Sequence, residues 1–290
     1  MDAFATLGAI IERRSGIVIG ANKDYLLRSR LAPLLRREAL DSLAELATLL
    51  SQSGNEALKD EVTDAVATHE TFFFRDWKPF NHLITTGLPG LLRRRPPGTK
   101  LRIWSAAAST GQEAYSLAIT LAECGLASRC RVEIVGTDIG RTPLEQARTG
   151  RFTQYEVDRG VSRLRLQRHF KPDRQGWVVN GDLRALCRFR EWNLLDDLSP
   201  LGRFDVVFCR NVLFYFNRAV RVRVVAAIRE LLAPDGLLYL GATESVLGID
   251  DTLQRDGACY VSALAPVAAC AVTPSHHAPP RAKDIQPVRA

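Results

Sequence analysis

The first 68 residues follow the hydrophobic spacing of amphipathic helices. Apolar side chains recur at intervals of three and four residues, which places them on one face of a helix. Such faces are formed by Phe4, Leu7, Ile10 and Ile11, by Leu26, Leu27, Leu31, Leu34 and Leu35, and by Leu43, Leu46, Leu49 and Leu50. This spacing predicts an all-helical domain over residues 1–68.

A different pattern occupies residues 69–263. Pro96, Pro97 and Gly98 form a loop, and short apolar runs then alternate with helical patterns. The predicted strands are Leu101–Ala106, Val132–Thr137, Phe204–Cys209, Leu237–Gly241 and Tyr260–Leu264, and the predicted helices are Glu113–Cys124, Leu144–Thr149 and Arg218–Leu232. Such alternation predicts an α/β domain with a mainly parallel, doubly wound sheet.

Two segments depart from this alternation. Residues 171–192 contain short β-type runs and the hairpin signal Asn180-Gly181, which predicts a small antiparallel β-subdomain whose last run rejoins the main sheet. Residues 264–290 are rich in alanine and proline and lack periodicity, so we expect a disordered tail or linker.

Composition narrows the class of protein. No apolar run reaches the roughly 18 residues that a membrane span needs, and the N-terminus has no secretory signal, so we expect a cytoplasmic protein. The six cysteines lack the spacing of a zinc site and are expected to be buried, reduced thiols. We therefore expect no metal.

The net charge of +7 comes mostly from arginine, and within residues 1–68 the positive charge is concentrated in one predicted helix. Residues 13–37 contain seven basic side chains and a single acidic one, Asp24. One interpretation is a solvated helix face, and the other is a docking face for an acidic partner, formed by Arg28, Arg30, Arg36 and Arg37. The charge is not interleaved with aromatic residues, so nucleic acid is the less favoured partner.

The most informative stretch is residues 101–113, where an apolar run ends in small residues, turns at Gly111 and opens into a helix. A strand, a tight turn and a helix N-terminus together form a ligand cradle in open α/β sheets. The alternative is that Glu113 only forms a capping box with Thr110. Asp138 ends the next strand, where a carboxylate can accept ribose hydroxyls, although it could also be a helix N-cap.

Five segments in the same order resemble the chemotaxis-receptor glutamate methyltransferases of the CheR family. The turn 106–116 reads AAASTGQEAYS, and the other segments are THETFFFRD (68–76), GTDI (136–139), FDVVFCRNVLFYF (204–216) and LAPDGLL (232–238). The resemblance covers roughly residues 5–263. It implies a Rossmann-like class I fold that uses S-adenosylmethionine to methylate receptor glutamates, leaving S-adenosylhomocysteine.

The resemblance also implies site residues. Arg75 and Tyr215 match positions close to the transferred methyl group. The implied cofactor site consists of His69, Thr71, Arg75, Gly111, Glu113, Asp138, Asn193, Leu194, Arg210 and Asn211. His69 stands where many members have asparagine, which predicts a changed pH dependence. Taken without the family, Arg75 could instead form a surface ion pair with Asp76, and Tyr215 could be a core residue.

The partner implied by the resemblance is the helical bundle of a chemotaxis receptor, whose acidic surface suits the basic helix. Some members also bind a receptor C-terminal peptide through the β-subdomain. Residues 171–192 leave few residues for such a groove, so we expect this protein not to depend on that tether. The alternatives are a non-catalytic receptor- or cofactor-binding module, and a methyltransferase with another substrate.

Overall fold

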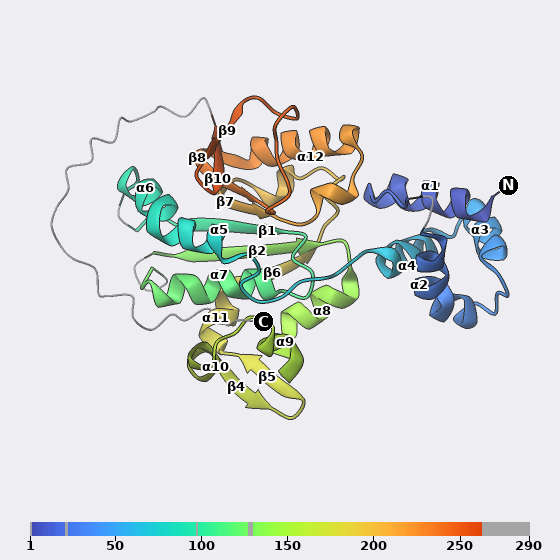
Figure 1. Ribbon diagram of the computed structural model, residues 1–290, viewed down its shortest axis with the longest axis horizontal. Coiled ribbons are helices and arrows are strands. Elements are labelled where there is room, and N and C mark those ends of the chain that lie inside the picture. Colours follow the sequence, from blue (N-terminus) through green and yellow to red (C-terminus); the bar gives the residue numbers. More distant parts are fainter. Residues whose placement is uncertain (1, 21–22, 97, 127–129, 263–290) are drawn as a thin grey trace.

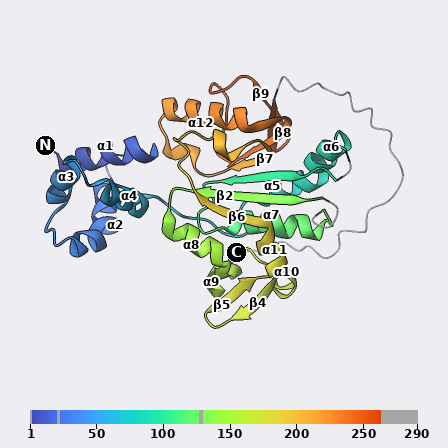
Figure 2. The ribbon, with the colours of Figure 1, turned by 180° about the vertical axis from the view of Figure 1, so that it is seen from behind.

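The computed structural model describes residues 2–20, 23–96, 98–126 and 130–262. A helical N-terminal domain lies at one end of the molecule, beside a sheet domain from which a small β-subdomain projects (Figures 1 and 2). None of the described helices is both long and apolar enough to cross a membrane. The predicted tail, residues 264–290, lies outside the described residues.

The N-terminal domain contains α1 (Ala3–Ser15), α2 (Asp24–Arg37), α3 (Leu43–Ser51) and α4 (Glu56–Val66). Two of its helices, α1 and α3, begin where a side chain satisfies a free backbone N–H group: Asp2 accepts from Phe4, and Ser42 accepts from Glu45. The predicted apolar faces meet in one core that includes fully buried leucines from α1, α2 and α3. This burial of otherwise unpartnered apolar faces holds the four short helices together.

The main sheet has seven strands in the order β6-β2-β1-β7-β8-β10-β9. Strands β6 to β8 are parallel, and β10 and β9 close the edge in antiparallel pairs. The bounds are β1 Leu101–Ala106, β2 Val132–Asp138, β6 Cys187–Glu191, β7 Phe204–Cys209, β8 Leu232–Leu240, β9 Leu253–Asp256 and β10 Cys259–Ser262. The predicted Rossmann-like fold is confirmed.

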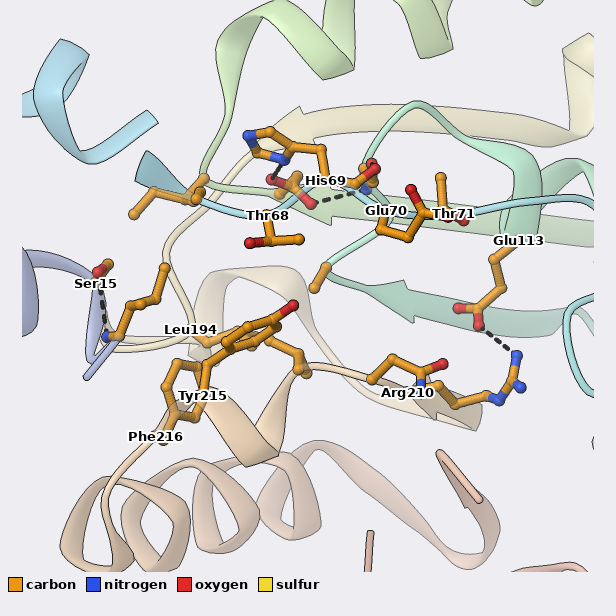
Figure 3. A pocket seen from close by; sticks show the side chains of 18 of the residues that line it. Ser15, Thr68, His69, Glu70, Thr71, Glu113, Leu194, Arg210, Tyr215 and Phe216 are labelled. Carbon is orange, nitrogen blue, oxygen red and sulfur yellow. Dashed lines mark hydrogen bonds and ion pairs between the residues drawn. The ribbon is translucent and has the colours of Figure 1, made fainter. Parts of the chain in front are cut away.

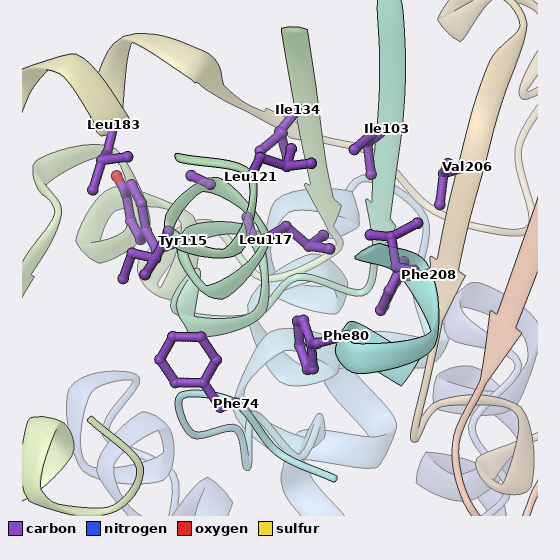
Figure 4. Packing of buried hydrophobic residues seen from close by; sticks show 14 of the residues in the cluster. Phe74, Phe80, Ile103, Tyr115, Leu117, Leu121, Ile134, Leu183, Val206 and Phe208 are labelled. Carbon is purple, nitrogen blue, oxygen red and sulfur yellow. The ribbon is translucent and has the colours of Figure 1, made fainter. Parts of the chain in front are cut away.

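Helices cover both faces of this sheet (Figure 1). One face packs against α7 (Gln112–Glu123), and the other against α12 (Arg218–Leu231). Figure 4 shows Leu117 and Leu121 of α7 packed near Ile103, Ile134 and Phe208 of the sheet. α8 (Arg141–Thr149) contacts β2 and β6. Both faces being buried explains why the strands read as continuous apolar runs.

One helical segment was not predicted. α5 (Trp77–His82), the π-helical turn Leu83–Gly87 and α6 (Leu88–Arg93) continue one another before β1. Phe80, Leu83 and Leu88 are fully buried against the same face of the sheet as α7. The mixed turn geometry and Pro79 and Pro89 obscure a regular helical period in this stretch.

The β-subdomain is larger than the predicted 171–192. It begins at β3 (Arg151–Phe152), which pairs with β5 (Gly176–Val179), and β5 also pairs with β4 (Phe170–Asp173). Its helices are α9 (Gln154–Asp158), α10 (Arg163–His169) and α11 (Gly181–Leu186). The hairpin prediction at Asn180-Gly181 is wrong, because Asn180 precedes α11 and the chain reverses between β4 and β5 instead. The predicted return to the main sheet is confirmed by β6.

Two further predictions need correction. β8 begins at Leu232, five residues before the predicted strand Leu237–Gly241, because residues 234–236 form an irregularity inside the strand, where pairing shifts from Phe204–Leu232 to Val206–Leu237. Such a bulge explains why the strand can contain proline and glycine in this stretch. Cys209 and Cys259 are buried as expected, but Cys130 and Cys187 are only half-buried and Cys124 is exposed at the end of α7. Cys270 lies outside the described residues.

Candidate active site

A pocket lies at the carboxyl ends of the central strands. The chain runs from β1 to β2 on one side and later to β7 on the other, and this switch in direction is where open α/β sheets bind ligands. The pocket is lined by Tyr215 and by nine of the ten predicted cofactor residues: His69, Thr71, Arg75, Glu113, Asp138, Asn193, Leu194, Arg210 and Asn211. Figure 3 shows part of this lining.

The tenth residue, Gly111, does not line the pocket. It precedes α7 with φ = 93°, in the left-handed region that favours glycine. A Cβ atom at this position would lie 2.9 Å from the Cβ atom of Ala147 on α8. Gly111 therefore allows the turn to pack closely against α8, and its place in the cofactor site stays a prediction.

The loop after β1 is fixed by its neighbours. Ala107 and Ser109 have φ values of 58° and 51°. The N–H group of Ser109 donates to Asp138 Oδ2 at 2.7 Å, and its hydroxyl donates to the carbonyl of His69 at 2.8 Å. These bonds join the end of β1 to the end of β2 and to the segment that enters the sheet domain.

Asp138 is a buried carboxylate at the end of β2, only 6% exposed. It also accepts the N–H of Gly140 at 2.9 Å. Burial raises the pKa of Asp138, although the two N–H donors and nearby His69 oppose that shift. The N-cap alternative is wrong, because the residue at the N-cap of α8 is Gly140.

His69 lies between two carboxylates. Its Nε2 is 3.2 Å from Asp64 Oδ1, and its Nδ1 is 3.8 Å from Asp138 Oδ1. Burial disfavours the imidazolium, but the hydrogen bond with Asp64 and the charges of both carboxylates outweigh it and raise the pKa of His69. His69 thus puts a titratable group beside Asp138.

Glu113 reaches the pocket from the first turn of α7. It accepts hydrogen bonds from the Ser105 hydroxyl at 2.8 Å and from Arg210 Nη1 at 3.0 Å, the pair drawn in Figure 3. Burial raises the pKa of Glu113, with Arg210 and Ser105 opposing. The capping-box alternative is wrong, because the Thr110 hydroxyl donates to Gln112 instead.

Arg210 follows the end of β7, and its side chain is buried, with 1% of it exposed. Besides Glu113, it donates to Asp76 Oδ2 at 3.0 Å and to the carbonyl of Arg75 at 2.8 Å. The surface ion-pair alternative for Arg75 is therefore wrong, because Asp76 pairs with Arg210. These bonds hold the loop of Arg75 against the sheet.

The guanidinium of Arg75 still has N–H groups that can donate to a ligand. It donates to the carbonyl of Glu70 at 3.0 Å and lies over the ring of Phe72, 5.5 Å from its centroid. Within the described ranges it forms no ion pair with a carboxylate. Since a guanidinium binds carboxylates in a bidentate manner, a free Arg75 in the pocket wall suits an anionic ligand group.

Tyr215 occupies a short 3-10 turn (Leu213–Tyr215) after β7. The residue is half-buried and lines the pocket, so it is not a core residue, whereas its neighbours Phe214 and Phe216 are exposed and buried respectively. In Figure 3 its ring extends into the space between Thr68 and Arg210. Its hydroxyl has no hydrogen-bond partner among the described residues.

The N-terminal domain completes the pocket, which sequence reasoning missed. Ser15 and Ile17, at and just after the end of α1, contribute to the lining. The N–H of Val18 donates to the carbonyl of Tyr215 at 2.9 Å, and Ile17 forms a β-bridge with Phe216. No local signal marks these contacts, because they join segments about 200 residues apart in sequence.

The four arginines of α2 that were predicted to form a docking face differ in their exposure and in their partners. Arg28 and Arg36 are exposed, and neither has a carboxylate partner in the described chain. Arg30 turns inward and donates to the carbonyls of Val66 and Ala67 at the end of α4, so its guanidinium already has partners within the domain. Arg37 forms an ion pair with Glu61 of α4.

The residues present fit S-adenosylmethionine. The buried Asp138 retains acceptor capacity for ribose hydroxyls, since a carboxylate has about four lone-pair sites and two are used by N–H groups. Arg75 suits the carboxylate of the methionyl group. In the residues that the structure describes, histidine, cysteine and acidic side chains form no cluster of three or more that could hold a metal ion.

Comparison with known proteins gives a family. Residues 69–259 match the domain described as "CheR methyltransferase, SAM binding domain", and residues 2–67 match "CheR methyltransferase, all-alpha domain". The chain is 39% identical over 256 residues to "Chemotaxis protein methyltransferase Cher2" of Pseudomonas putida, covering 87% of this chain and 93% of that protein. It is 40% identical, with the same coverage, to "Chemotaxis protein methyltransferase 1" of Pseudomonas aeruginosa.

Fold, pocket and matched domain thus define an S-adenosylmethionine-dependent methyltransferase. More specifically, the chain belongs to the CheR methyltransferase family.

Proposed function

We propose that this protein transfers the methyl group of S-adenosylmethionine to glutamate side-chain carboxylates of chemotaxis receptors, giving glutamate methyl esters and S-adenosylhomocysteine. The observation that carries the proposal is the pairing, in one pocket, of a guanidinium without a carboxylate partner on Arg75 with a free hydroxyl on Tyr215. The relatives' names, chemotaxis protein methyltransferases, support this substrate class.

The bound cofactor supplies an electrophilic methyl group on a sulfonium. A glutamate with an ordinary pKa of about 4.3 is already an anion at neutral pH, so the protein need not remove a proton from it. Tyr215 orients the attacking oxygen through its hydroxyl, and the reaction needs no base. Its task is alignment, which can account for a large share of the rate.

The other lining residues hold the cofactor and exclude water. Asp138 receives the ribose hydroxyls, and Arg75 binds the methionyl carboxylate or the substrate carboxylate. Glu113, Asn193, Leu194 and Asn211 complete the cofactor cradle, with His69 and Thr71 above it. Ile17 and Phe216, joined across the two domains, screen one side of the pocket from solvent. A dry site favours the meeting of a carboxylate with a cationic methyl donor, because charge disappears in the reaction.

We assign the receptor-facing surface to Arg28 and Arg36, the exposed arginines of α2. The substrate is then the acidic, cytoplasmic helical bundle of a receptor. Long-range attraction between the two surfaces would raise the association rate and would weaken with salt.

We also infer that docking does not depend on a receptor C-terminal peptide. The subdomain is larger than its sequence predicted, but its strands are short, with two residues in β3 and four in each of β4 and β5. Titration calorimetry with the C-terminal pentapeptide of a cognate receptor should give no binding heat. Saturable binding that Trp177→Ala in β5 abolishes would overturn this inference.

Methyl transfer to receptor membranes tests the proposed function. Wild-type protein with radiolabelled S-adenosylmethionine should label the receptor, and mild base should release the label because it is held as an ester. Arg75→Ala should lose the labelling, whereas Arg93→Ala, at the far end of α6, should keep it. Label that resists base would instead indicate transfer to nitrogen and would contradict the proposal.

A further inference from the structure

The turn after β8 contains a carboxylate aimed at the loop that carries Tyr215. Glu244 does not line the pocket, yet both of its oxygens accept backbone N–H groups. Oε2 accepts those of Asn211 and Gly241, each at 2.8 Å. Oε1 accepts those of Val212 at 2.9 Å and Leu213 at 2.7 Å. Three of the four donors are thus consecutive residues of one loop, and charge-assisted bonds of this kind are strong and directional.

The local backbone is shaped around this carboxylate. Asn211 has φ = 59°, a conformation that residues other than glycine seldom adopt. A Cβ atom on Gly241 would lie 2.6 Å from Glu244 Oε2 and 2.9 Å from Asn211 Nδ2. Only glycine therefore lets the end of β8 approach the loop closely enough for its N–H to share the same oxygen.

The same loop is held at its other end by the N-terminal domain. The carbonyl of Tyr215 accepts the N–H of Val18, and Phe216 bridges to Ile17. Residues 211–215 are thus held at one end by Glu244 and at the other by the N-terminal domain. They include the pocket residues Asn211, Val212 and Tyr215. Glu244 is thus the anchor supplied by the sheet domain itself.

We propose that Glu244 is a positioning residue for methyl transfer: it fixes residues 211–213 and thereby sets the place of the Tyr215 hydroxyl in the pocket. This inference rests on the proposed function, because the role of Tyr215 belongs to it. Glu244 does not line the pocket itself and acts through the loop, by accepting the backbone N–H groups of the lining residues Asn211 and Val212.

The test uses Glu244→Gln, which keeps the size of the side chain but turns an amide NH2 toward backbone N–H donors. Asp250→Asn is the matched control, since Asp250 lies further along the same connection and accepts the N–H of Thr252. In the cofactor-free protein, amide hydrogen exchange at Val212 and Leu213 should become about tenfold faster in Glu244→Gln. It should stay unchanged in Asp250→Asn. Unchanged exchange in Glu244→Gln would overturn the proposal.

Kinetics separate positioning from general destabilisation. Glu244→Gln should lower kcat about tenfold to a hundredfold, since a displacement of about 1 Å at a reacting centre has an effect of this size. In a Tyr215→Phe background the same change should lower kcat less than about twofold, because the group that it positions is already absent. Full multiplication of the two effects would overturn the proposal. If wild-type protein methylates no receptor, the proposed function fails, and the exchange measurement, which needs neither receptor nor cofactor, still decides whether Glu244 holds the loop.

Discussion

At the scale of single residues, unusual backbone conformations gather around the pocket. Six described residues other than glycine have positive φ, and five of them lie in loops that border the pocket: Phe74, Asp76, Ala107, Ser109 and Asn211. Such conformations persist only where the surroundings enforce them, and they tend to mark functional sites. Arg210, the Asp138–Ser109 bond and Glu244 provide that enforcement here.

Gly111→Ala should lower the free energy of unfolding by about 1–3 kcal/mol, because alanine would adopt a strained φ and its Cβ would press on Ala147. Gly8→Ala is the control, since a Cβ there meets nothing within 4 Å inside α1. It should stabilise the protein by about 0.5–1 kcal/mol. Urea unfolding measures both, and equal effects of the two substitutions would contradict the assignment of Gly111 to the turn.

His69 should make stability depend on pH. Its pKa is raised in the folded protein, so it binds a proton more tightly than in the unfolded chain. The resulting stabilisation is fully present below about pH 6.5 and is lost as the pH rises through the higher, folded-state pKa.

His69→Asn should remove that fall in unfolding free energy, as followed by urea denaturation across this pH range. His82→Asn is the control, because the ring of His82 faces the Tyr239 hydroxyl and not a carboxylate. A fall that persists unchanged in His69→Asn would show that another group is responsible.

At the scale of elements, different arginines of α2 serve receptor docking and the stability of the fold. Arg28→Glu with Arg36→Glu should raise the KM for receptor several-fold and reduce its salt dependence, while S-adenosylhomocysteine affinity and stability stay near wild type. Arg30→Ala should instead lower the unfolding free energy by about 1–3 kcal/mol, because it leaves carbonyls at the end of α4 without their donor. An unchanged receptor KM in the double variant would contradict the docking surface.

The sequence predicted the elements whose burial pattern is regular. Leu7 and Ile11 mark one face of α1, and the mostly apolar run 204–209 matches β7, a strand buried along its whole length. It did not predict α5 or the start of the β-subdomain, where prolines and two-residue strands leave no period to read. Asn180-Gly181 resembles a hairpin locally, but tertiary packing places it at a helix start.

At the scale of the whole molecule, the pocket is a product of two domains. Polar residues after β1, β2 and β7 could be assembled from sequence, because parallel strands bring their carboxyl ends to one edge. Ser15 and Ile17 could not, because their approach depends on how the helical domain docks. For the same reason Glu244, Arg30 and Gly111 have roles that only the packed structure distinguishes from those of neighbours of the same kind.

The most direct test of the account is to locate the transferred methyl group. Receptor incubated with the protein and S-adenosylmethionine is digested and analysed by peptide mass spectrometry, with Tyr215→Phe in parallel. The account predicts methyl esters on glutamates exposed on the receptor's cytoplasmic bundle, removed by mild base and strongly reduced in the variant. Methyl groups on lysine or other nitrogens, or none on a receptor that binds the protein, would contradict it.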